Sequence, residues 1–209
     1  QLNNDIWIKR EDLQPVHSFK LRGAYNKLSQ LSDADRAAGV IAASAGNHAQ
    51  GVAYSAKKLE ITATIVMPVT TPGIKINAVK SLGATVILFG DTYDEAYDHA
   101  RSLAKQDELS FIHPYDDPLV IAGQGTIAIE LLDDCPNMDY IFVAVGGGGL
   151  IAGIAAYIKA INPKIKIIGV EPDNAACMTA ALAANKRITL DHVGIFADGV
   201  AVKQVGEIP

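Results

Sequence analysis

The chain has 209 residues, of which 49% are hydrophobic and 20% charged, a balance typical of a globular protein that can bury a sizeable core. Its formal net charge of −5, with Lys and Arg scattered, excludes an extended basic surface for nucleic acid or an anionic membrane. Cys135 and Cys177 are too few for a disulfide framework and no secretory signal is recognisable, so we expect a cytoplasmic protein that acts on small molecules.

Short β-branched or aliphatic runs alternate with longer helical patterns along nearly the whole chain. The predicted strands are 6–9, 40–43, 61–67, 85–89, 140–145 and 166–170. The predicted helices are 19–31, 47–59, 73–82, 93–106, 121–132, 150–161 and 175–183. This alternation indicates an α/β fold with mainly parallel sheets flanked by helices.

The stretch His-Pro-Tyr-Asp-Asp-Pro at 113–118 is the predicted domain boundary, because two prolines and two acids there separate two βα blocks. We therefore expect a smaller lobe, 25–117, inserted into a larger lobe built from 1–24 and 118–209. The chain begins with Gln1 rather than Met and ends just after a new segment starts, so we expect a fragment whose larger lobe is incomplete at its C-terminus.

Four consecutive glycines, Gly146, Gly147, Gly148 and Gly149, follow an apolar predicted strand and precede a predicted helix. Backbone N–H groups without side chains, at the positive end of a helix, form a site for a phosphate. A tight turn with close strand–helix packing would also use glycine, although it needs fewer than four. The glycines also interrupt an uncharged run, 140–158, that would otherwise be long enough to span a membrane.

The same glycines fit the dinucleotide fingerprint G-x-G-x-x-A over residues 147–152. Glu171 follows the next predicted strand, near the spacing of the acid that binds the ribose of NAD. On this stretch alone, an NAD-binding dehydrogenase module stays open.

The stretch Ser-Ala-Gly-Asn-His-Ala-Gln-Gly at 44–51 lies at another predicted strand-to-helix junction. Gly46 allows close backbone approach, so the turn can present N–H groups to a carboxylate, and the amide of Asn47 can pair with a ring hydroxyl. Ser, Gly and Asn are also good turn and capping residues, and His48 could be a solvated residue of the first helical turn. A binding loop and a plain helix cap both stay open.

Lys20 lies at the start of the first predicted helix, after Ser18 and Phe19. A lysine that forms an imine needs shielding and a lowered pKa, and a helix N-terminus disfavours its protonated form. Taken alone, Ser18 as an N-cap and Lys20 on a hydrated face is the simpler interpretation. However, an aldehyde for Lys20, a phosphate for the glycines and a ring hydroxyl for Asn47 are combined in pyridoxal phosphate, and in α/β folds such loops share one crevice.

Four stretches in this order resemble the serine/threonine dehydratase group of fold-type II pyridoxal phosphate enzymes: S-F-K-L-R-G-A at 18–24, S-A-G-N-H-A-Q-G at 44–51, A-G-Q-G-T at 122–126 and V-G-G-G-G-L at 145–150. The resemblance covers essentially the whole chain. The stretches 170–182 and 195–207 look more like the biosynthetic threonine branch than the catabolic one. The resemblance implies a two-lobed, tryptophan synthase β-like fold and β-elimination of L-threonine to 2-oxobutanoate and ammonia, the first step of isoleucine biosynthesis.

By this resemblance, Lys20 would bond to pyridoxal phosphate and move the proton of the substrate α-carbon, with Phe19 packed beside the cofactor. The residues that would hold the phosphate are Gly146, Gly147, Gly148, Gly149 and Leu150. Asn47 would face the ring hydroxyl, and Gly199 would pass close to the ring. The substrate carboxylate would be held by Ser44, Ala45, Gly46, Asn47 and His48.

The sequence also departs from some relatives. Serine racemases carry a second Ser where this chain has Ala45, which disfavours racemisation. Several relatives bind a divalent ion through Glu, a carbonyl and Asp; Glu171 and Ala175 match, but Cys177 replaces the acid, so we expect no firm metal site.

The resemblance also bears on assembly and activity. It implies a homotetramer, and it would place the partner of the pyridine nitrogen and an isoleucine-sensing domain after residue 209. We therefore expect the segment alone to be weak or inactive. A non-catalytic scaffold is the remaining alternative, and intact Lys20, Asn47 and glycines argue against it.

Overall fold

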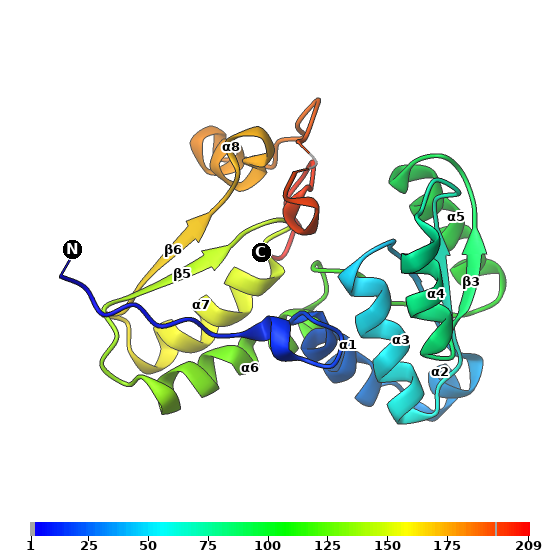
Figure 1. Cartoon of the computed structure of the whole chain (residues 1–209), viewed down its shortest axis with the longest axis horizontal. Coiled ribbons are helices and arrows are strands. Elements are labelled where there is room, and N and C mark those ends of the chain that lie inside the picture. The colour runs from blue at the N-terminus through cyan, green and yellow to red at the C-terminus, as the bar shows by residue number, and fades with distance from the viewer. Residues whose placement is uncertain (1–2, 195) are drawn as a thin grey trace.

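The computed structural model describes residues 3–194 and 196–209, and its elements form two groups joined by α1 and α6 (Figure 1). Ile195, which opens the compared stretch 195–207, lies outside the described residues. The helices of eight residues or more are α1 (Lys20–Ser29), α3 (Asn47–Leu59), α4 (Gly73–Ser81), α5 (Tyr93–Gln106), α6 (Pro118–Asp134), α7 (Gly149–Ile161) and α8 (Cys177–Ala184).

The first group contains a four-stranded sheet in the order β3-β2-β1-β4. Its strands are β1 (Val40–Ala43), β2 (Ala63–Met67), β3 (Thr85–Leu88) and β4 (Ser110–Phe111), and all its pairings are parallel. Along β1, Val40 and Ala42 pack toward α1, α3 and α4, while Ile41 and Ala43 pack toward α5. A parallel strand covered on both faces explains why the run is apolar at every position. We call this sheet with α3, α4 and α5 the four-stranded unit.

The second group contains two parallel strands, β5 (Tyr140–Ala144) and β6 (Lys166–Val170). Ile141 and Val143 of β5 pack with Ile154 and Ile158 of α7 and with α6, which covers the same face. Phe142 points the other way and is 70% exposed. We call this sheet with α6, α7 and α8 the two-stranded unit.

Helix α1 is held between the two units by close backbone contact at glycines. A Cβ atom on Gly123 of α6 would lie 2.6 Å from the Cα atom of Gly23 in α1, and one on Gly51 of α3 would lie 2.9 Å from the carbonyl carbon of Lys20. On its other side α6 meets α7 in the same way, because a Cβ on Gly125 would lie 2.9 Å from the Gly153 carbonyl oxygen. The motif A-G-Q-G-T is therefore a helix-packing seam that fixes the start of α1.

The predicted α/β class with parallel sheets is confirmed, as are the helices 47–59 and 93–106 and the strands 40–43 and 166–170. The remaining predicted strands and helices in the described residues occur with shifted ends, except for strand 6–9, which is wrong. There Ile6, Trp7 and Ile8 are 77%, 80% and 76% exposed, and a β-branched run without a neighbouring strand forms no ladder.

Among the α-helices and β-strands of the described residues, one helix and one strand were not predicted. Helix α2 (Asp33–Ala38) is capped by the Ser32 side chain, which accepts the Asp35 N–H at 3.1 Å. Strand β4 is only two residues long, too short for periodicity to reveal it. In the part of the chain that the structure describes, no helix has the length and apolar character needed to cross a membrane.

Candidate active site

Lys20 is the first residue of α1, and its amine lies in an enclosed position. The Nζ atom donates to the Pro114 carbonyl oxygen at 2.8 Å and lies 5.4 Å from the centre of the Phe19 ring. Burial lowers the pKa of this amine to about 8. An amine with such a pKa is a usable nucleophile and base near neutral pH.

The alternative in which Ser18 caps the helix is wrong. Helix α1 begins without a side-chain cap, and the Ser18 Oγ atom is buried without a hydrogen-bond partner among the described atoms. A hydrated face for Lys20 is equally inconsistent with its Pro114 contact and lowered pKa.

A hollow lies between the start of α1, the end of β5 and the glycine loop. Its lining residues are Phe19, Lys20, Pro114, Tyr115, Gln124, Ala144, Gly146, Gly147, Gly148, Gly149, Leu150, Gly199, Val200 and Val202. Three segments far apart in the sequence thus bring the lysine, the four glycines, Leu150 and Gly199 to one place. The sequence motifs predicted one crevice for Lys20, the glycine loop and the Asn47 loop, and the first two of these line this hollow.

The glycine loop joins β5 to α7 in a conformation that side chains would obstruct. A Cβ on Gly147 would collide with the Tyr115 ring, and one on Gly149 would lie 2.6 Å from the Tyr115 carbonyl oxygen. Gly148 has φ of +95°, in the left-handed region that favours glycine. No side chain caps α7, so the first N–H groups of this 13-residue helix are available to an anion.

The acid expected for a nucleotide ribose is already engaged. The Glu171 carboxylate accepts the N–H groups of Met178 and Thr179, both at 2.8 Å, and the Thr179 hydroxyl at 2.7 Å. These bonds cap α8, so the geometry removes the main support for an NAD site.

Cys177 is buried with its Sγ atom 3.6 Å from the Gly146 carbonyl oxygen.

Within the described residues, no group of three or more His, Cys, Asp or Glu side chains is placed to hold a metal ion.

The loop 44–48 lies at the carboxyl end of β1. The Ser44 hydroxyl accepts the Gly46 N–H at 3.1 Å, α3 begins at Asn47, and space is open around the position of a Gly46 Cβ. Asn47 is exposed, and neither it nor Ser44, Ala45 or Gly46 belongs to the lining of the hollow described above. These four residues therefore lie outside the lining of that hollow, while His48 of the same loop lies close enough to Lys20 to feel its charge.

His48 is not the solvated residue that one interpretation of the loop expected. Its ring is buried, and its Nε2 atom lies 2.8 Å from the Ile112 carbonyl oxygen, to which it donates. Burial, and then the nearby charge of Lys20, lower its pKa to about 3. His48 is thus a neutral side chain that ties the 44–48 loop to the segment after β4.

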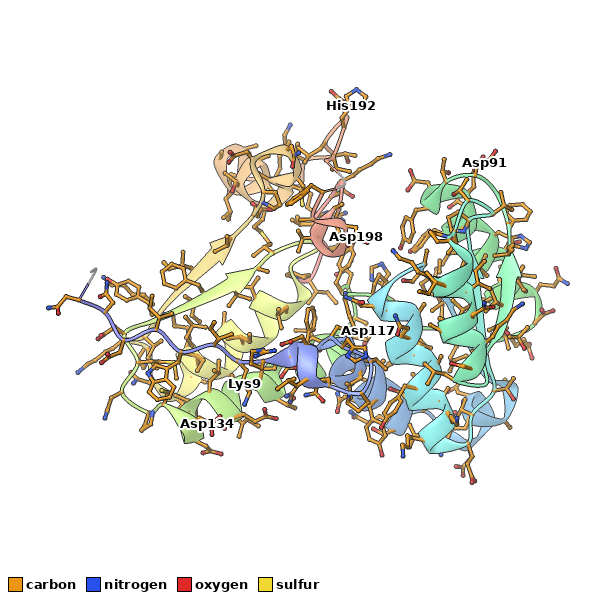
Figure 2. All side chains as sticks on the ribbon, viewed as in Figure 1. Lys9, Asp91, Asp117, Asp134, His192 and Asp198 are labelled. Carbon is orange, nitrogen blue, oxygen red and sulfur yellow. The ribbon has the colours of Figure 1, made fainter. Side chains whose placement is uncertain are left out.

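Arg22 organises the other side of α1. Its guanidinium donates to both carboxylate oxygens of Glu11 at 2.8 and 2.7 Å, to both of Glu130 at 2.6 and 2.9 Å, and to the Thr126 hydroxyl at 3.1 Å. Lys9 extends the cluster to Asp134, which Figure 2 shows beside the N-terminal segment. The cluster joins the N-terminal segment to α1 and α6, and its central residue, Arg22, follows Lys20 by two positions.

Pro114, Tyr115 and Gln124 line the site but were absent from the predicted site residues. The first two fall in the 113–118 stretch, where proline and acid content indicated a boundary instead. Gln124 falls in the A-G-Q-G-T motif, and its side-chain oxygen accepts the Gly23 N–H at 3.2 Å. Both motifs were visible in the sequence, but only the fold reveals that these three residues line the Lys20 hollow.

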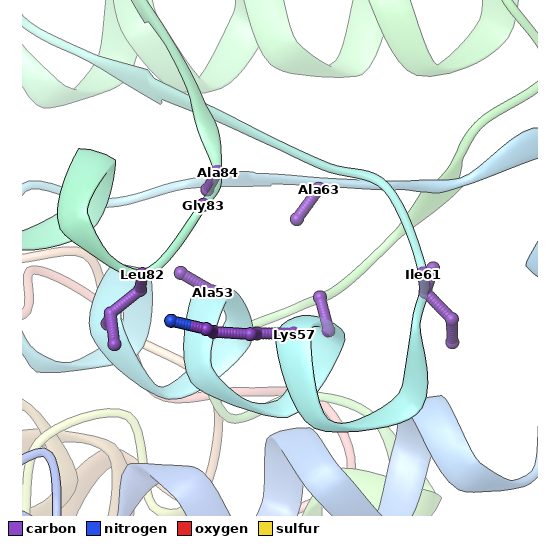
Figure 3. A pocket seen from close by; sticks show the side chains of 8 residues that line it. Ala53, Lys57, Ile61, Ala63, Leu82, Gly83 and Ala84 are labelled. Carbon is purple, nitrogen blue, oxygen red and sulfur yellow. The ribbon is translucent and has the colours of Figure 1, made fainter.

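A second hollow lies between α3, β2 and the loop after α4 (Figure 3). Its lining residues are Ala53, Ala56, Lys57, Ile61, Ala63, Leu82, Gly83 and Ala84. Lys57 is the one ionisable side chain in that lining, which includes none of the predicted site residues. The chemistry of the molecule therefore centres on the Lys20 hollow.

A parallel α/β fold that places a low-pKa lysine opposite a glycine loop at a helix N-terminus defines the class: fold-type II pyridoxal phosphate enzymes. The family model described as pyridoxal-phosphate dependent enzyme matches residues 1–209, and the chain belongs to this family.

The comparisons also identify individual relatives. The chain is 58% identical over 207 residues to L-threonine dehydratase biosynthetic IlvA of Haemophilus influenzae, covering 99% of this chain and 40% of that protein. The processed form of threonine deaminase isoform 2 from Solanum lycopersicum superposes with a TM-score of 0.94 at 56% identity, over 95% of this chain and 55% of that one. Maize serine racemase superposes with a TM-score of 0.92 at 38% identity, over 96% of this chain and 60% of that one.

Proposed function

We propose that the protein acts as a pyridoxal phosphate-dependent threonine ammonia-lyase, which converts L-threonine to 2-oxobutanoate and ammonia. The observation that carries the proposal is the Lys20 amine in one hollow with the glycine loop. The chain spans about 40% of the length of its curated Haemophilus relative, so the activity of a whole enzyme is part of the proposal. The printed biosynthetic names of the relatives support a place in isoleucine biosynthesis.

The residues present fit the cofactor. The N–H groups of Gly146 to Gly149 and Leu150, at the start of α7, suit a phosphate, and the close approach of Tyr115 leaves no room for a side chain on Gly147 or Gly149. Lys20 offers an amine, Phe19 an aromatic wall and Gly199 close backbone approach. When bound, pyridoxal phosphate supplies an aldehyde that bonds to an amine and a ring that accepts electrons from the substrate.

Lys20 is assigned two tasks, to anchor the cofactor and to move the proton of the substrate α-carbon. Both need an unprotonated amine, and a pKa of about 8 makes the unprotonated fraction at neutral pH far larger than that of an ordinary lysine. The Pro114 carbonyl orients the amine without adding a negative charge that would restore its proton affinity.

The carboxylate of the substrate is assigned to the loop of Ser44, Ala45, Gly46, Asn47 and His48, with Asn47 also facing the cofactor hydroxyl. Open space at Gly46 and the N-terminus of the 13-residue α3 support this assignment. Ala45 carries no hydroxyl that could transfer a proton on the opposite face of the substrate, so elimination is favoured over the racemase activity named for the maize relative.

The wider organisation is also a proposal. The four-stranded and two-stranded sheets support a smaller lobe of 25–117 and a larger lobe of 1–24 and 118–209. A homotetramer is proposed from the family resemblance. A cytoplasmic location is proposed from composition and from the scarcity of cysteine.

A visible absorption spectrum of the purified protein with pyridoxal phosphate tests the proposal. We expect a band of lysine-bound cofactor that borohydride abolishes, leaving the cofactor covalently attached to the Lys20 peptide. Lys20→Ala should lose both the band and the attachment, while Lys58→Ala, a change at an exposed lysine, should retain them. A band that persists unchanged in Lys20→Ala would refute the assignment. The substrate is tested separately, by comparing the rates of ammonia release from threonine and from serine.

A further inference from the structure

We propose that His113 is a positioning residue for Lys20, which holds the Pro114 carbonyl against the lysine amine and the Tyr115 ring against the glycine loop. The inference deepens the proposed function and rests on it. His113 lies in the 113–118 stretch that indicated only a boundary in the sequence.

The His113 ring folds back on its own segment. Its Nδ1 atom accepts the N–H of Tyr115 at 3.3 Å and the N–H of Asp116 at 2.8 Å. Two donors directed at Nδ1 require a lone pair there, so the ring proton is on Nε2. The ring is therefore a neutral double acceptor that closes the turn around Pro114.

This turn places two groups of the site. The Pro114 carbonyl oxygen, between His113 and its two bonded amides, accepts from Lys20 Nζ at 2.8 Å. The next residue, Tyr115, packs its ring against the position where a Gly147 side chain would lie, and its hydroxyl donates to the Gln204 carbonyl oxygen at 3.3 Å. One turn thus sets the distance between the amine and the glycine loop.

The two ends of the turn are fixed independently. His48 donates to the Ile112 carbonyl oxygen before it, and the Asp116 carboxylate accepts the N–H groups of Glu207 and Ile208 at 3.0 and 2.9 Å after it. With both ends held, the conformation of Pro114 itself depends on the His113 acceptor. Burial lowers the pKa of His113 to about 4, which keeps the acceptor available at neutral pH.

The test compares His113→Leu, which removes the acceptor, with His113→Asn, whose side-chain oxygen lies near the place of Nδ1. The His113 ring centre lies 4.8 Å from that of Tyr115. His99→Leu is the matched control, because His99 likewise packs on an aromatic ring, that of Phe89 at 3.8 Å, but lies on α5. The readout is the rate at which Lys20 is modified in cofactor-free protein, by acetic anhydride and by pyridoxal phosphate with borohydride, relative to Lys58.

We expect His113→Leu to slow modification of Lys20 by pyridoxal phosphate at least about tenfold, because a misplaced amine loses its orientation toward the aldehyde. The relative rate with acetic anhydride should also change, and amide exchange at Tyr115 and Asp116 should accelerate. His113→Asn should restore all three to within about twofold of the unmodified protein, and His99→Leu should leave them unchanged.

A residue with a merely structural role would lower the unfolding midpoint without changing Lys20 modification in the folded variant, and that result would overturn the proposal. If His113→Leu does not fold, His113→Gln moves the acceptor by one methylene and must show the same ordering. Absence of the lysine-bound band in the unmodified protein would refute the proposed function, whereas the anhydride and exchange data would still decide the positioning.

Discussion

At the scale of single residues, the environment of Lys20 decides whether the chain carries reactive chemistry. The amine contacts a carbonyl oxygen and an aromatic ring, and burial lowers its pKa to about 8. Lys58, by contrast, is an exposed side chain. The lowered pKa of Lys20 raises the fraction of its amine that is unprotonated, and so reactive, near neutral pH.

We predict that the rate of Lys20 modification by pyridoxal phosphate rises with pH with a midpoint near 8. The direction follows because only the unprotonated amine reacts, and a lowered pKa moves its appearance to lower pH. Rates measured from pH 6 to pH 10, with Lys58 as the internal reference, provide the check. A rate that still rises steeply at pH 10, as the ordinary lysine pKa near 10.4 requires, would mean that Lys20 is solvated.

At the scale of elements, glycines and one arginine hold α1 in place. We predict that Gly123→Ala destabilises the protein by about 1–3 kcal/mol, because its Cβ would lie 2.6 Å from the Gly23 Cα and the Arg22 carbonyl oxygen. Gly73→Ala at the start of α4, where nothing lies within 4 Å, is the control and should be neutral or slightly stabilising. Urea unfolding measures both; equal effects would exclude a close-packed seam.

The Arg22 cluster supports a second prediction at this scale. Arg22→Lys keeps the charge but loses the planar fork that reaches Glu11 and Glu130, so we expect a loss of about 1–3 kcal/mol in unfolding free energy. Arg10→Lys is the matched control, since Arg10 also binds a carboxylate, that of Asp12, through two nitrogens but at the surface. It should have no measurable effect, and a similar loss in both variants would contradict the cluster's special role.

These elements also show which features of the fold and site can be predicted from the sequence. Periodicity placed the helices and buried strands because their apolar patterns are local. The glycine and lysine motifs were noticed because their chemistry is unusual, and their residues line one hollow in the structure. The sequence-based prediction was wrong at 6–9, because a strand forms only beside a partner strand. It also missed Pro114 and Tyr115, because their place beside the site depends on the fold: Pro114 contacts a lysine 94 positions earlier in the chain. Asn47 was assigned from its motif, and its place relative to the hollow depends on how the two units meet.

At the scale of the whole molecule, two ion pairs connect the four-stranded unit to the segment that passes the site. Lys75 of α4 pairs with Asp198 at 3.2 Å, and Asp94 of α5 pairs with Lys203 at 3.1 Å. Figure 2 shows Asp198 between the two groups of elements. Residues Gly199, Val200 and Val202, which line the Lys20 hollow, lie between these two anchors.

We predict that Lys203→Glu weakens retention of pyridoxal phosphate, because repulsion from Asp94 would move the segment that borders the hollow. Exposed pairs contribute less than about 1 kcal/mol each, so the dissociation constant should rise by less than about fivefold. The reversed pair, Asp94→Lys with Lys203→Glu, should restore retention, and 1 M salt should reduce the effect of the single change by screening. Fluorescence titration with the cofactor measures these constants, and a loss that neither reversal nor salt relieves would show that Lys203 acts through packing rather than charge.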